Sequence, residues 1–198
     1  MVSFLLQKLM IHKYCPNTPG LRSLQKKEEL YKLLKEVNQA RNAIKATNNP
    51  PLLLKLAPDL SNEEMNEIVS VILKKESKVD GLIISNTTID RPQLQNTEFP
   101  NEAGGLSGKP LTVKSTEMIK QMYKLTKGKV PIVGVGGVFT GQDAYDKILA
   151  GASAVQIYTA LIYHGPPVVS KIKNELAELL QRDGYNNVNE AVGKGIKY

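Results

Sequence analysis

Residues 130–137 read VPIVGVGG, an apolar run that stops on a pair of glycines. Three further runs have a similar apolar character: 51–57 (PLLLKLA), 79–86 (VDGLIISN) and 152–158 (ASAVQIY). None of them alternates strictly between apolar and polar residues, as a strand with one solvent-exposed face does. Residues 51–57, 79–86, 130–135 and 152–158 are therefore each predicted to be a strand buried on both faces, which is typical of a parallel sheet covered by helices.

Helical patterns separate these strands, and a short strand near residues 9–14 is predicted ahead of them. Ser61 and Glu64 have the spacing of a capping box and predict a helix start. The apolar residues expected to face inward are Leu30, Leu33, Leu34, Val37 and Ile44, then Met65, Ile68, Val69 and Ile72, then Met118, Ile119, Met122 and Leu125, and finally Val169, Ile172, Leu176, Leu179 and Leu180. The repeated strand–helix order predicts an α/β fold with four to five parallel strands, either doubly wound or a (β/α) barrel.

The length and composition fit one domain with a packed core, because the chain has 198 residues of which 41% are hydrophobic. No apolar run approaches the roughly 18–20 residues that span a bilayer. The N-terminal segment MVSFLLQKLMIHKY has neither the cleavage site of a secretory signal nor the Arg and Ser content of a transit peptide. The single cysteine, Cys15, excludes an intramolecular disulfide and a multi-cysteine metal site.

The formal net charge of +7 is concentrated near the N-terminus, where residues 1–50 hold nine basic and three acidic side chains. Most of these basic residues lie on the predicted helix 26–45, interleaved with glutamates, which is typical of a solvated helix face. The sequence contains no recognition module for nucleic acid, so no nucleic-acid partner is expected.

The candidate site residues lie where the predicted strands end, which is where parallel α/β folds bind ligands. Gly136 and Gly137 precede a helix, and glycines allow backbone N–H groups to approach an anion. With Tyr158 and Thr159 after the next strand, they resemble the phosphate site formed by the last two loops of a barrel. The alternative for the glycines is a purely structural turn.

Lys55 interrupts a run of leucines, and a buried lysine is costly unless a charged ligand or a carboxylate lies beside it. The alternative is a lysine on an edge strand. Asn86 and Thr87 offer uncharged donors and acceptors for a planar substrate or a cofactor ring, or else only cap the start of a loop. Ser107 and Gly108 belong to a glycine-rich loop that either closes over a ligand or simply turns.

Cys15 opens the loop CPNTPG at a further strand end. A free thiol has a pKa near ~8.5 and needs activation to act as a nucleophile or base, so an inert role is the alternative. His12 and His164 are expected to be bystanders.

Six segments together carry a more specific signal than any one residue: CPNTPGLRSLQ, LLLKLAPDL, DGLIISNTT, GGLSGKPL, VPIVGVGGVFTGQDA and AVQIYTALIYHGPP. In order and spacing they resemble class 2 dihydroorotate dehydrogenases, the membrane-linked, quinone-reducing type. The resemblance runs from about Cys15 to the C-terminus, so residues 15–198 are expected to be the C-terminal part of such a barrel and residues 1–14 a non-matching segment.

The resemblance implies an FMN-dependent (β/α)₈ enzyme of the mitochondrial inner membrane that oxidises dihydroorotate to orotate in pyrimidine biosynthesis and passes electrons to a quinone. It implies catalytic roles for Cys15 as the base and Lys55 beside the flavin ring. It assigns Asn17, Asn86 and Thr87 to the substrate. The residues assigned to FMN are Lys55, Ser85, Ser107, Gly108, Gly136, Gly137, Tyr158 and Thr159.

The sequence departs from the family pattern at two positions. Cys15 stands where class 2 enzymes have a serine base, although the soluble class uses cysteine, and His12 stands in place of an expected asparagine. The first three barrel strands and the N-terminal membrane helices have no counterpart, so membrane association would require elements missing from this chain. An incomplete TIM-type barrel, about the C-terminal half, would expose sheet edges and favour self-association.

Two alternatives to the enzyme remain. One is a truncated or splice-variant half-barrel that has no activity on its own, with weak or no FMN retention. The other is a different phosphate-binding barrel enzyme, such as a lyase or isomerase, which the spacing of Lys55 and Asn86–Thr87 disfavours.

Overall fold

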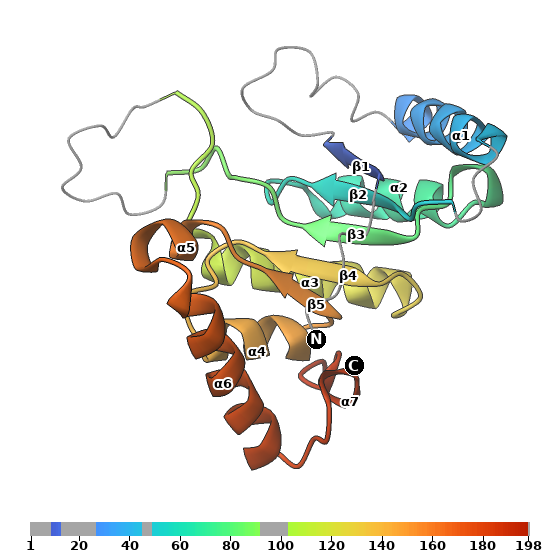
Figure 1. The fold of residues 1–198 in the computed structure, drawn as a ribbon. Coiled ribbons are helices and arrows are strands. Elements are labelled where there is room, and N and C mark those ends of the chain that lie inside the picture. Colours follow the sequence, from blue (N-terminus) through green and yellow to red (C-terminus); the bar gives the residue numbers. More distant parts are fainter. Residues whose placement is uncertain (1–8, 13–26, 45–48, 92–102, 198) are drawn as a thin grey trace.

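The computed structural model describes residues 9–12, 27–44, 49–91 and 103–197. Its centre is one parallel sheet in which each strand pairs with its neighbour in the sequence (Figure 1). The strands are β1 (Leu9–His12), β2 (Leu52–Leu56), β3 (Gly81–Ile84), β4 (Ile132–Val135) and β5 (Ala154–Gln156). A doubly wound sheet reverses its strand order at a switch point, and this sheet does not. The order is that of a segment of a barrel.

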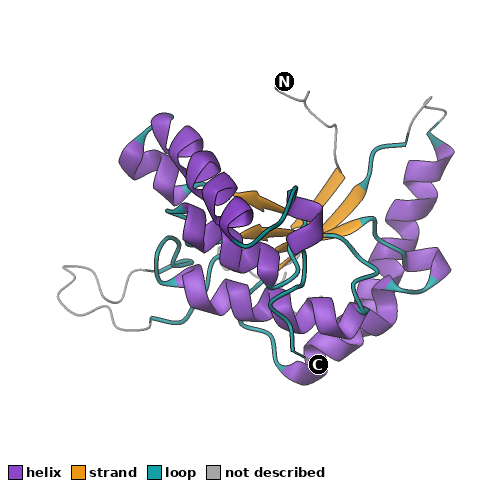
Figure 2. Ribbon diagram, turned by 90° about the horizontal axis from the view of Figure 1, so that it is seen from below, coloured by secondary structure: helices purple, strands orange, loops and turns teal. Residues whose placement is uncertain are grey.

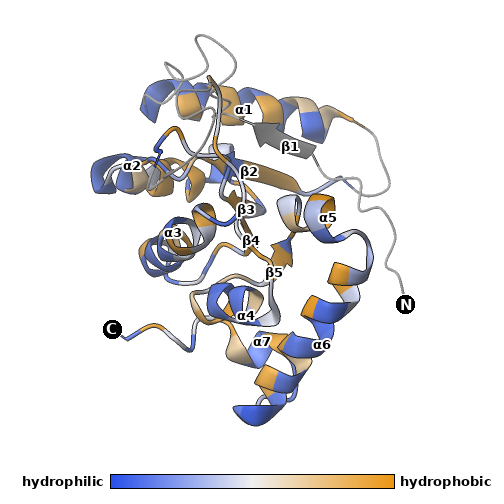
Figure 3. Ribbon diagram, turned by 90° about the vertical axis from the view of Figure 1, so that its left-hand side faces the viewer, coloured by the Kyte–Doolittle hydropathy of each residue, from blue (hydrophilic) through white to orange (hydrophobic). Residues whose placement is uncertain are grey.

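The helices that connect the strands lie in a row on one face of the sheet (Figure 3). These are α1 (Lys27–Ala43), α2 (Asn62–Ile72), α3 (Leu111–Thr126) and α4 (Gly141–Leu149), and each packs against the next. Right-handed crossovers that always step in the same direction place every helix on the same side. Seen from below, the helices form an arc around the strands (Figure 2).

The remaining helices follow β5 or bridge two elements. They are η2 (Lys75–Ser77), α5 (Thr159–His164), α6 (Pro167–Arg182) and α7 (Val188–Ala191). Of these, α6 packs along α4 and so extends the helical layer at the end of the sheet. Among the described residues, no helix combines the length and apolar character required to cross a membrane.

Two capping boxes set the starts of α2 and α4. At α2 the Glu64 N–H donates to Ser61 Oγ at 3.2 Å, and the Ser61 N–H donates to Glu64 Oε2 at 2.7 Å. The predicted box is therefore confirmed. Thr140 and Asp143 form the same reciprocal pair at the start of α4. Each box satisfies backbone N–H groups that have no partner within their own helix.

The main core lies between the sheet and the row of helices. The strands contribute Leu52, Leu54 and Leu56 from β2, all fully buried, which pack against helix side chains such as Leu34 and Ile72. On the opposite face of β2 the intervening residues are only half-buried. Lys55 is one of these residues, so it projects from the face that the helices leave open.

Three expectations about the ends of elements were wrong. Ile44 lies beyond the end of α1 and is 60% exposed. Val169 is 43% exposed, and Val168 is buried in its place, in one cluster with Ile172. The last strand ends at Gln156, so residues 157 and 158 belong to the turn before α5.

Candidate functional site

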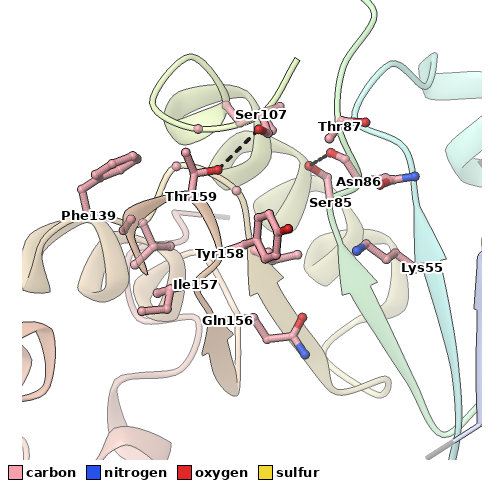
Figure 4. Close-up of a pocket in the computed structure, with 17 residues that line it drawn as sticks. Lys55, Ser85, Asn86, Thr87, Ser107, Phe139, Gln156, Ile157, Tyr158 and Thr159 are labelled. Atoms are coloured by element: carbon pink, nitrogen blue, oxygen red, sulfur yellow. Dashed lines mark hydrogen bonds between the residues drawn. The ribbon is translucent and has the colours of Figure 1, made fainter. Parts of the chain in front are cut away.

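A single pocket at the carboxyl ends of β2 to β5 gathers the predicted site residues (Figure 4). It encloses about 530 Å³ of space not filled by atoms, part of it open to solvent. The predicted residues that line it are Lys55, Ser85, Asn86, Thr87, Ser107, Gly108, Gly136, Gly137, Tyr158 and Thr159. The strand-end argument thus predicted the neighbourhood of these side chains correctly, and their chemical roles stay predictions.

Lys55 enters this pocket from the interior of the sheet. Its strand pairs with β1 through His12 and with β3 through Ile83, so the edge-strand alternative is wrong. The side chain is half-buried and extends from β2 toward the pocket (Figure 4). A half-buried cation in the lining of a pocket suits a negative or electron-rich ligand.

The backbone of Ser85 and Asn86, which follow β3, continues the hydrogen bonding to the neighbouring strands and so fixes this part of the pocket lining. The Ser85 N–H donates to the Val135 carbonyl at 2.9 Å, and the Asn86 N–H donates to the Leu56 carbonyl at 2.7 Å. The Ser85 hydroxyl donates to the Asn86 carbonyl at 2.9 Å. Because both neighbouring strands hold this segment, Asn86 and Thr87 are presented at a defined place on the pocket wall.

The glycine-rich loop returns to the pocket and contacts the start of α5. Thr88 and Leu106 exchange backbone hydrogen bonds of 3.1 and 2.7 Å, which fold the loop back against the segment after β3. The Thr159 hydroxyl donates to Ser107 Oγ at 3.4 Å (Figure 4). A Cβ on Gly108 would lie 3.1 Å from the Thr159 methyl carbon, so the loop and the start of α5 are in close contact.

Gly136 and Gly137 form the turn after β4 and have φ values of 110° and 69°. The Gly136 carbonyl accepts from Ser115 Oγ at 3.0 Å, and the Gly137 carbonyl accepts from Thr112 Oγ1 at 2.7 Å. In a trans peptide the N–H points opposite to the carbonyl. The N–H groups of Gly137 and Val138 therefore point away from α3, on the side where both glycines line the pocket. Successive N–H groups in such a turn form an anion-binding concavity.

The helix that follows the glycines in the chain, α4, does not contribute its N-terminus to this pocket. In α4 the Gly141 N–H donates to Glu175 Oε2 at 2.6 Å, and the Asp143 N–H donates to Thr140 Oγ1 at 3.1 Å. None of the residues of α4 lines the pocket. The helices that begin at the pocket are α3 and α5, whose first residues, Leu111 and Thr159, are part of the lining.

Asp143 holds the segment that follows the glycines. Its Oδ2 accepts from the N–H groups of Phe139 and Thr140, each at 3.0 Å, and Lys109 Nζ lies 3.3 Å from Oδ1. Burial raises the pKa of this carboxyl, but the Phe139 N–H, the Thr140 side chain and the Lys109 charge outweigh burial, so the net effect lowers it. The aspartate is therefore an anchor in its ionised form rather than a proton donor to a ligand.

A charged cluster of Lys114, Asp59 and Asp90 lies beside Thr88. Lys114 on α3 donates to Asp59 Oδ1 at 2.5 Å and also pairs with Asp90. Burial raises the pKa of Asp59, while hydrogen bonds from Lys114, Thr88 and the Ile89 N–H lower it more strongly. Burial likewise lowers the pKa of Lys114, and its two carboxylate partners raise it above the ordinary value. Asp59 and Lys114 are therefore both ionised near neutral pH.

Sequence reasoning missed several lining residues. Gln156 is a polar residue within an apolar strand, the same signal that identified Lys55, and could have been found in that way. Phe139 follows the glycine turn, and its position in the lining depends on how that turn folds. The Phe139 ring meets the His164 ring edge-on at 6.0 Å, and His164 itself does not line the pocket.

Cys15 and Asn17 lie outside the described residues, so their proposed roles rest on the sequence. Within the described part of the chain, no group of three or more His, Cys, Asp and Glu side chains is arranged to hold a metal ion.

Comparison with known proteins gives consistent matches. A family model described as dihydroorotate dehydrogenase matches residues 6–180. This match begins ahead of Cys15, and the division of the chain at that residue stays a prediction. Proteins named "Dihydroorotate dehydrogenase (quinone), mitochondrial" from Mus musculus and Oryza sativa are 52% and 51% identical over 185 and 192 residues, which are 93% and 96% of this chain. The alignments cover 46% and 40% of those proteins, so the chain spans about half the length of the curated relatives it matches.

Solved structures agree with the fold. A ligand-free DHODH from Eimeria tenella superimposes with a TM-score of 0.90 at 40% sequence identity, over 96% of this chain and 56% of that one. A second structure from the same organism, in complex with ferulenol, gives a TM-score of 0.89. The sequential parallel sheet, the family match and these superpositions lead to one conclusion. This chain belongs to the dihydroorotate dehydrogenase family.

Proposed function

We propose that the pocket at the ends of β2 to β5 holds FMN and that the chain contributes it to the oxidation of dihydroorotate to orotate in pyrimidine biosynthesis. The observation that carries the proposal is the pairing of two features in one pocket. Lys55 supplies a half-buried cation, and the turn at Gly136 and Gly137 supplies backbone N–H groups directed away from α3. A flavin mononucleotide needs both, because it joins an electron-accepting ring to a phosphate.

The residues present fit this cofactor. A Cβ on Gly137 would lie 2.5 Å from the Thr112 nitrogen, so the turn is packed tightly on one side, and its bare backbone forms the lining on the other. The N–H groups of Gly137 and Val138, with Tyr158 and Thr159, would hold the phosphate. Lys55, Ser85, Ser107 and Gly108 would hold the ring and its side chain. Bound there, FMN would supply the hydride acceptor for the substrate.

Asn86 and Thr87 would orient the substrate through hydrogen bonds to its amide and carboxylate edges, together with Asn17. Cys15 would act as the base that removes a proton from one substrate carbon. A thiolate does this more readily as the pH rises toward the pKa of the thiol, ordinarily near ~8.5. Lys55 would stabilise the negative charge that develops beside the ring as the substrate is oxidised.

A quinone acceptor is also part of the proposal, as the names of the relatives suggest. Tyr158 lines the pocket and is 72% exposed, and α5 continues from it with Ile162 and Tyr163, which are 69% and 75% exposed. Exposed side chains of this kind, following a residue of the pocket lining, would suit the approach of an apolar ring. We further propose a mitochondrial inner-membrane location and residues 15–198 as the C-terminal part of the barrel.

Equilibrium binding of FMN and riboflavin tests the proposal, because the two flavins share the ring and differ in the phosphate. FMN should bind at least about tenfold more tightly, the equivalent of one charge-assisted hydrogen bond. Dihydroorotate added without oxygen should then bleach the flavin absorbance. Equal affinities would remove the phosphate site from the proposal. Bound FMN that dihydroorotate never bleaches would favour the alternative of a chain with no activity on its own.

A further inference from the structure

Lys147 on α4 is a fully buried lysine that lies outside the pocket lining, with 0% of the residue exposed. Its ammonium crosses to the first turns of α3 and donates to Ser115 Oγ at 2.7 Å, Thr116 Oγ1 at 2.8 Å and the Thr112 carbonyl at 3.2 Å. Three donors thus meet three acceptors, and none of these acceptors is a carboxylate. An apolar side chain of similar length would occupy the space without the cost of burying a charge.

Two of the three residues that accept from Lys147, Ser115 and Thr112, also hold the glycine turn. Ser115 Oγ lies 3.0 Å from the Gly136 carbonyl, and Thr112 Oγ1 donates to the Gly137 carbonyl at 2.7 Å. A serine hydroxyl has one hydrogen. Because Ser115 already accepts from Lys147, its single hydrogen is left for a carbonyl, and the Leu111 carbonyl at 2.8 Å and the Gly136 carbonyl at 3.0 Å share it. The buried charge is therefore two hydrogen bonds away from the peptide that lines the pocket.

The stem of Lys147 also lies under the strand that leads to this turn. A Cβ on Gly134 would be 3.2 Å from Lys147 Cδ and 3.0 Å from the end of the Ile119 side chain. Only a residue without a side chain lets β4 approach α3 and α4 this closely. Lys147 is thus in contact with β4, with α3 and, through Ser115, with the turn between β4 and α4.

We propose that Lys147 is a positioning residue for the phosphate-binding turn: through Ser115 and Thr112 it holds the carbonyls of Gly136 and Gly137 against α3 and so directs the N–H groups of Gly137 and Val138 into the pocket. The inference deepens the proposed function and rests on it for the identity of the anion. The orientation of the turn itself depends only on contacts within the chain.

The charge of Lys147 can be changed by pH, so a titration tests this arrangement. Burial lowers the pKa of Lys147 to about 8, and the carboxylates of Asp143 and Asp146 on its own helix oppose that shift. The groups that face the ammonium from α3 are two hydroxyls and a carbonyl, and β4 contributes Gly134; none of these titrates between pH 7 and 10. Above the pKa, the neutral amine has one hydrogen fewer to donate.

Carbon-detected NMR of the free protein tests the positioning role without any flavin. Across pH 7–10 the carbonyl ¹³C shifts of Gly136 and Gly137 should follow a titration with a midpoint near 8. They should be flat in Lys147→Met. Ser115→Ala should also abolish the response at Gly136, whereas Thr116→Val, which removes an acceptor of Lys147 that does not touch the turn, should retain it. If the carbonyl shifts of Gly136 and Gly137 in the wild-type protein show no titration with a midpoint near 8, the proposal is overturned, even if the variants fail to fold.

Flavin binding then tests the consequence for the anion. Lys147→Met should weaken FMN binding about tenfold and leave riboflavin binding unchanged, because riboflavin has no phosphate. Lys173→Met, an exposed lysine on α6, controls for the loss of one positive charge. Equal weakening of both flavins would mean general loss of structure and would overturn the role. If wild-type protein binds neither flavin, the proposed function fails, while the carbonyl shifts still decide the positioning role.

Discussion

The substitution Gly137→Ala tests how tightly the turn after β4 is held against α3. A Cβ at this position would lie 2.2 Å from Thr112 Oγ1 and 2.5 Å from the Thr112 nitrogen. The backbone nitrogen belongs to the first turn of α3 and cannot rotate away as a side chain can. Gly184 provides a matched control, because its φ of 78° is close to the 69° of Gly137 and a Cβ there has nothing within 4 Å.

The two variants differ by a magnitude that follows from these contacts. Alanine at positive φ costs about 1 kcal/mol, and this cost is common to both positions. At Gly137, α3 must also retreat by roughly 1 Å to restore ordinary contact, and overpacking of this kind costs about 1–3 kcal/mol. The retreat also lengthens the hydrogen bond from Thr112 Oγ1 to the Gly137 carbonyl, which contributes about 1 kcal/mol. Gly137→Ala should therefore lose about 3–5 kcal/mol of unfolding free energy and Gly184→Ala about 1 kcal/mol.

Urea unfolding followed by far-ultraviolet circular dichroism gives both values, and FMN and riboflavin titrations under native conditions show the effect on the pocket. Gly137→Ala should lose the preference for FMN over riboflavin, and Gly184→Ala should keep it. If the two variants lose the same unfolding free energy to within 1 kcal/mol, the glycine turn does not pack tightly against α3 at Gly137, and the predicted difference is refuted.

Three further perturbations probe the pocket, its outer wall and the helical layer. Lys55→Met should slow anaerobic flavin reduction by dihydroorotate about a hundredfold in stopped flow; an unchanged rate would remove Lys55 from the mechanism. Lys114→Met should cost about 1 kcal/mol in urea unfolding at low salt, because Asp59 loses a partly buried partner, and less at 1 M salt; a cost independent of salt would contradict the ionic origin. Burial and a hydrogen bond to Asp183 raise the pKa of Tyr145 to about 12, above its ordinary value of 10, so the wild-type unfolding free energy should fall between pH 10 and 12. In Tyr145→Phe that decline should be smaller. Identical pH profiles of the two proteins would show that the decline in unfolding free energy does not come from ionisation of this phenol.

Much of the site was predictable because residue type and position agree at the strand ends. Lys55 stands out as a charge within a leucine run, and the glycines after β4 stand out because they follow an apolar strand directly. Gln156 carries the same kind of signal in a shorter strand and was overlooked. The place of Phe139 in the lining was not predictable, because it depends on the fold of the glycine turn and on the capping contacts of Asp143.

The sequence by itself determined the order of strands and helices, the capping box at Ser61 and the set of polar strand ends, because these are properties of residues that are neighbours in the chain or recur with a short period. Tertiary structure decided between a doubly wound sheet and a barrel segment, since both have the same local patterns and differ only in which strands pair. It also decided that α3 rather than α4 begins at the pocket, and that Lys147 reaches Ser115 across 32 positions of chain. Such contacts arise from strand register and helix packing over long separations, which no local pattern records.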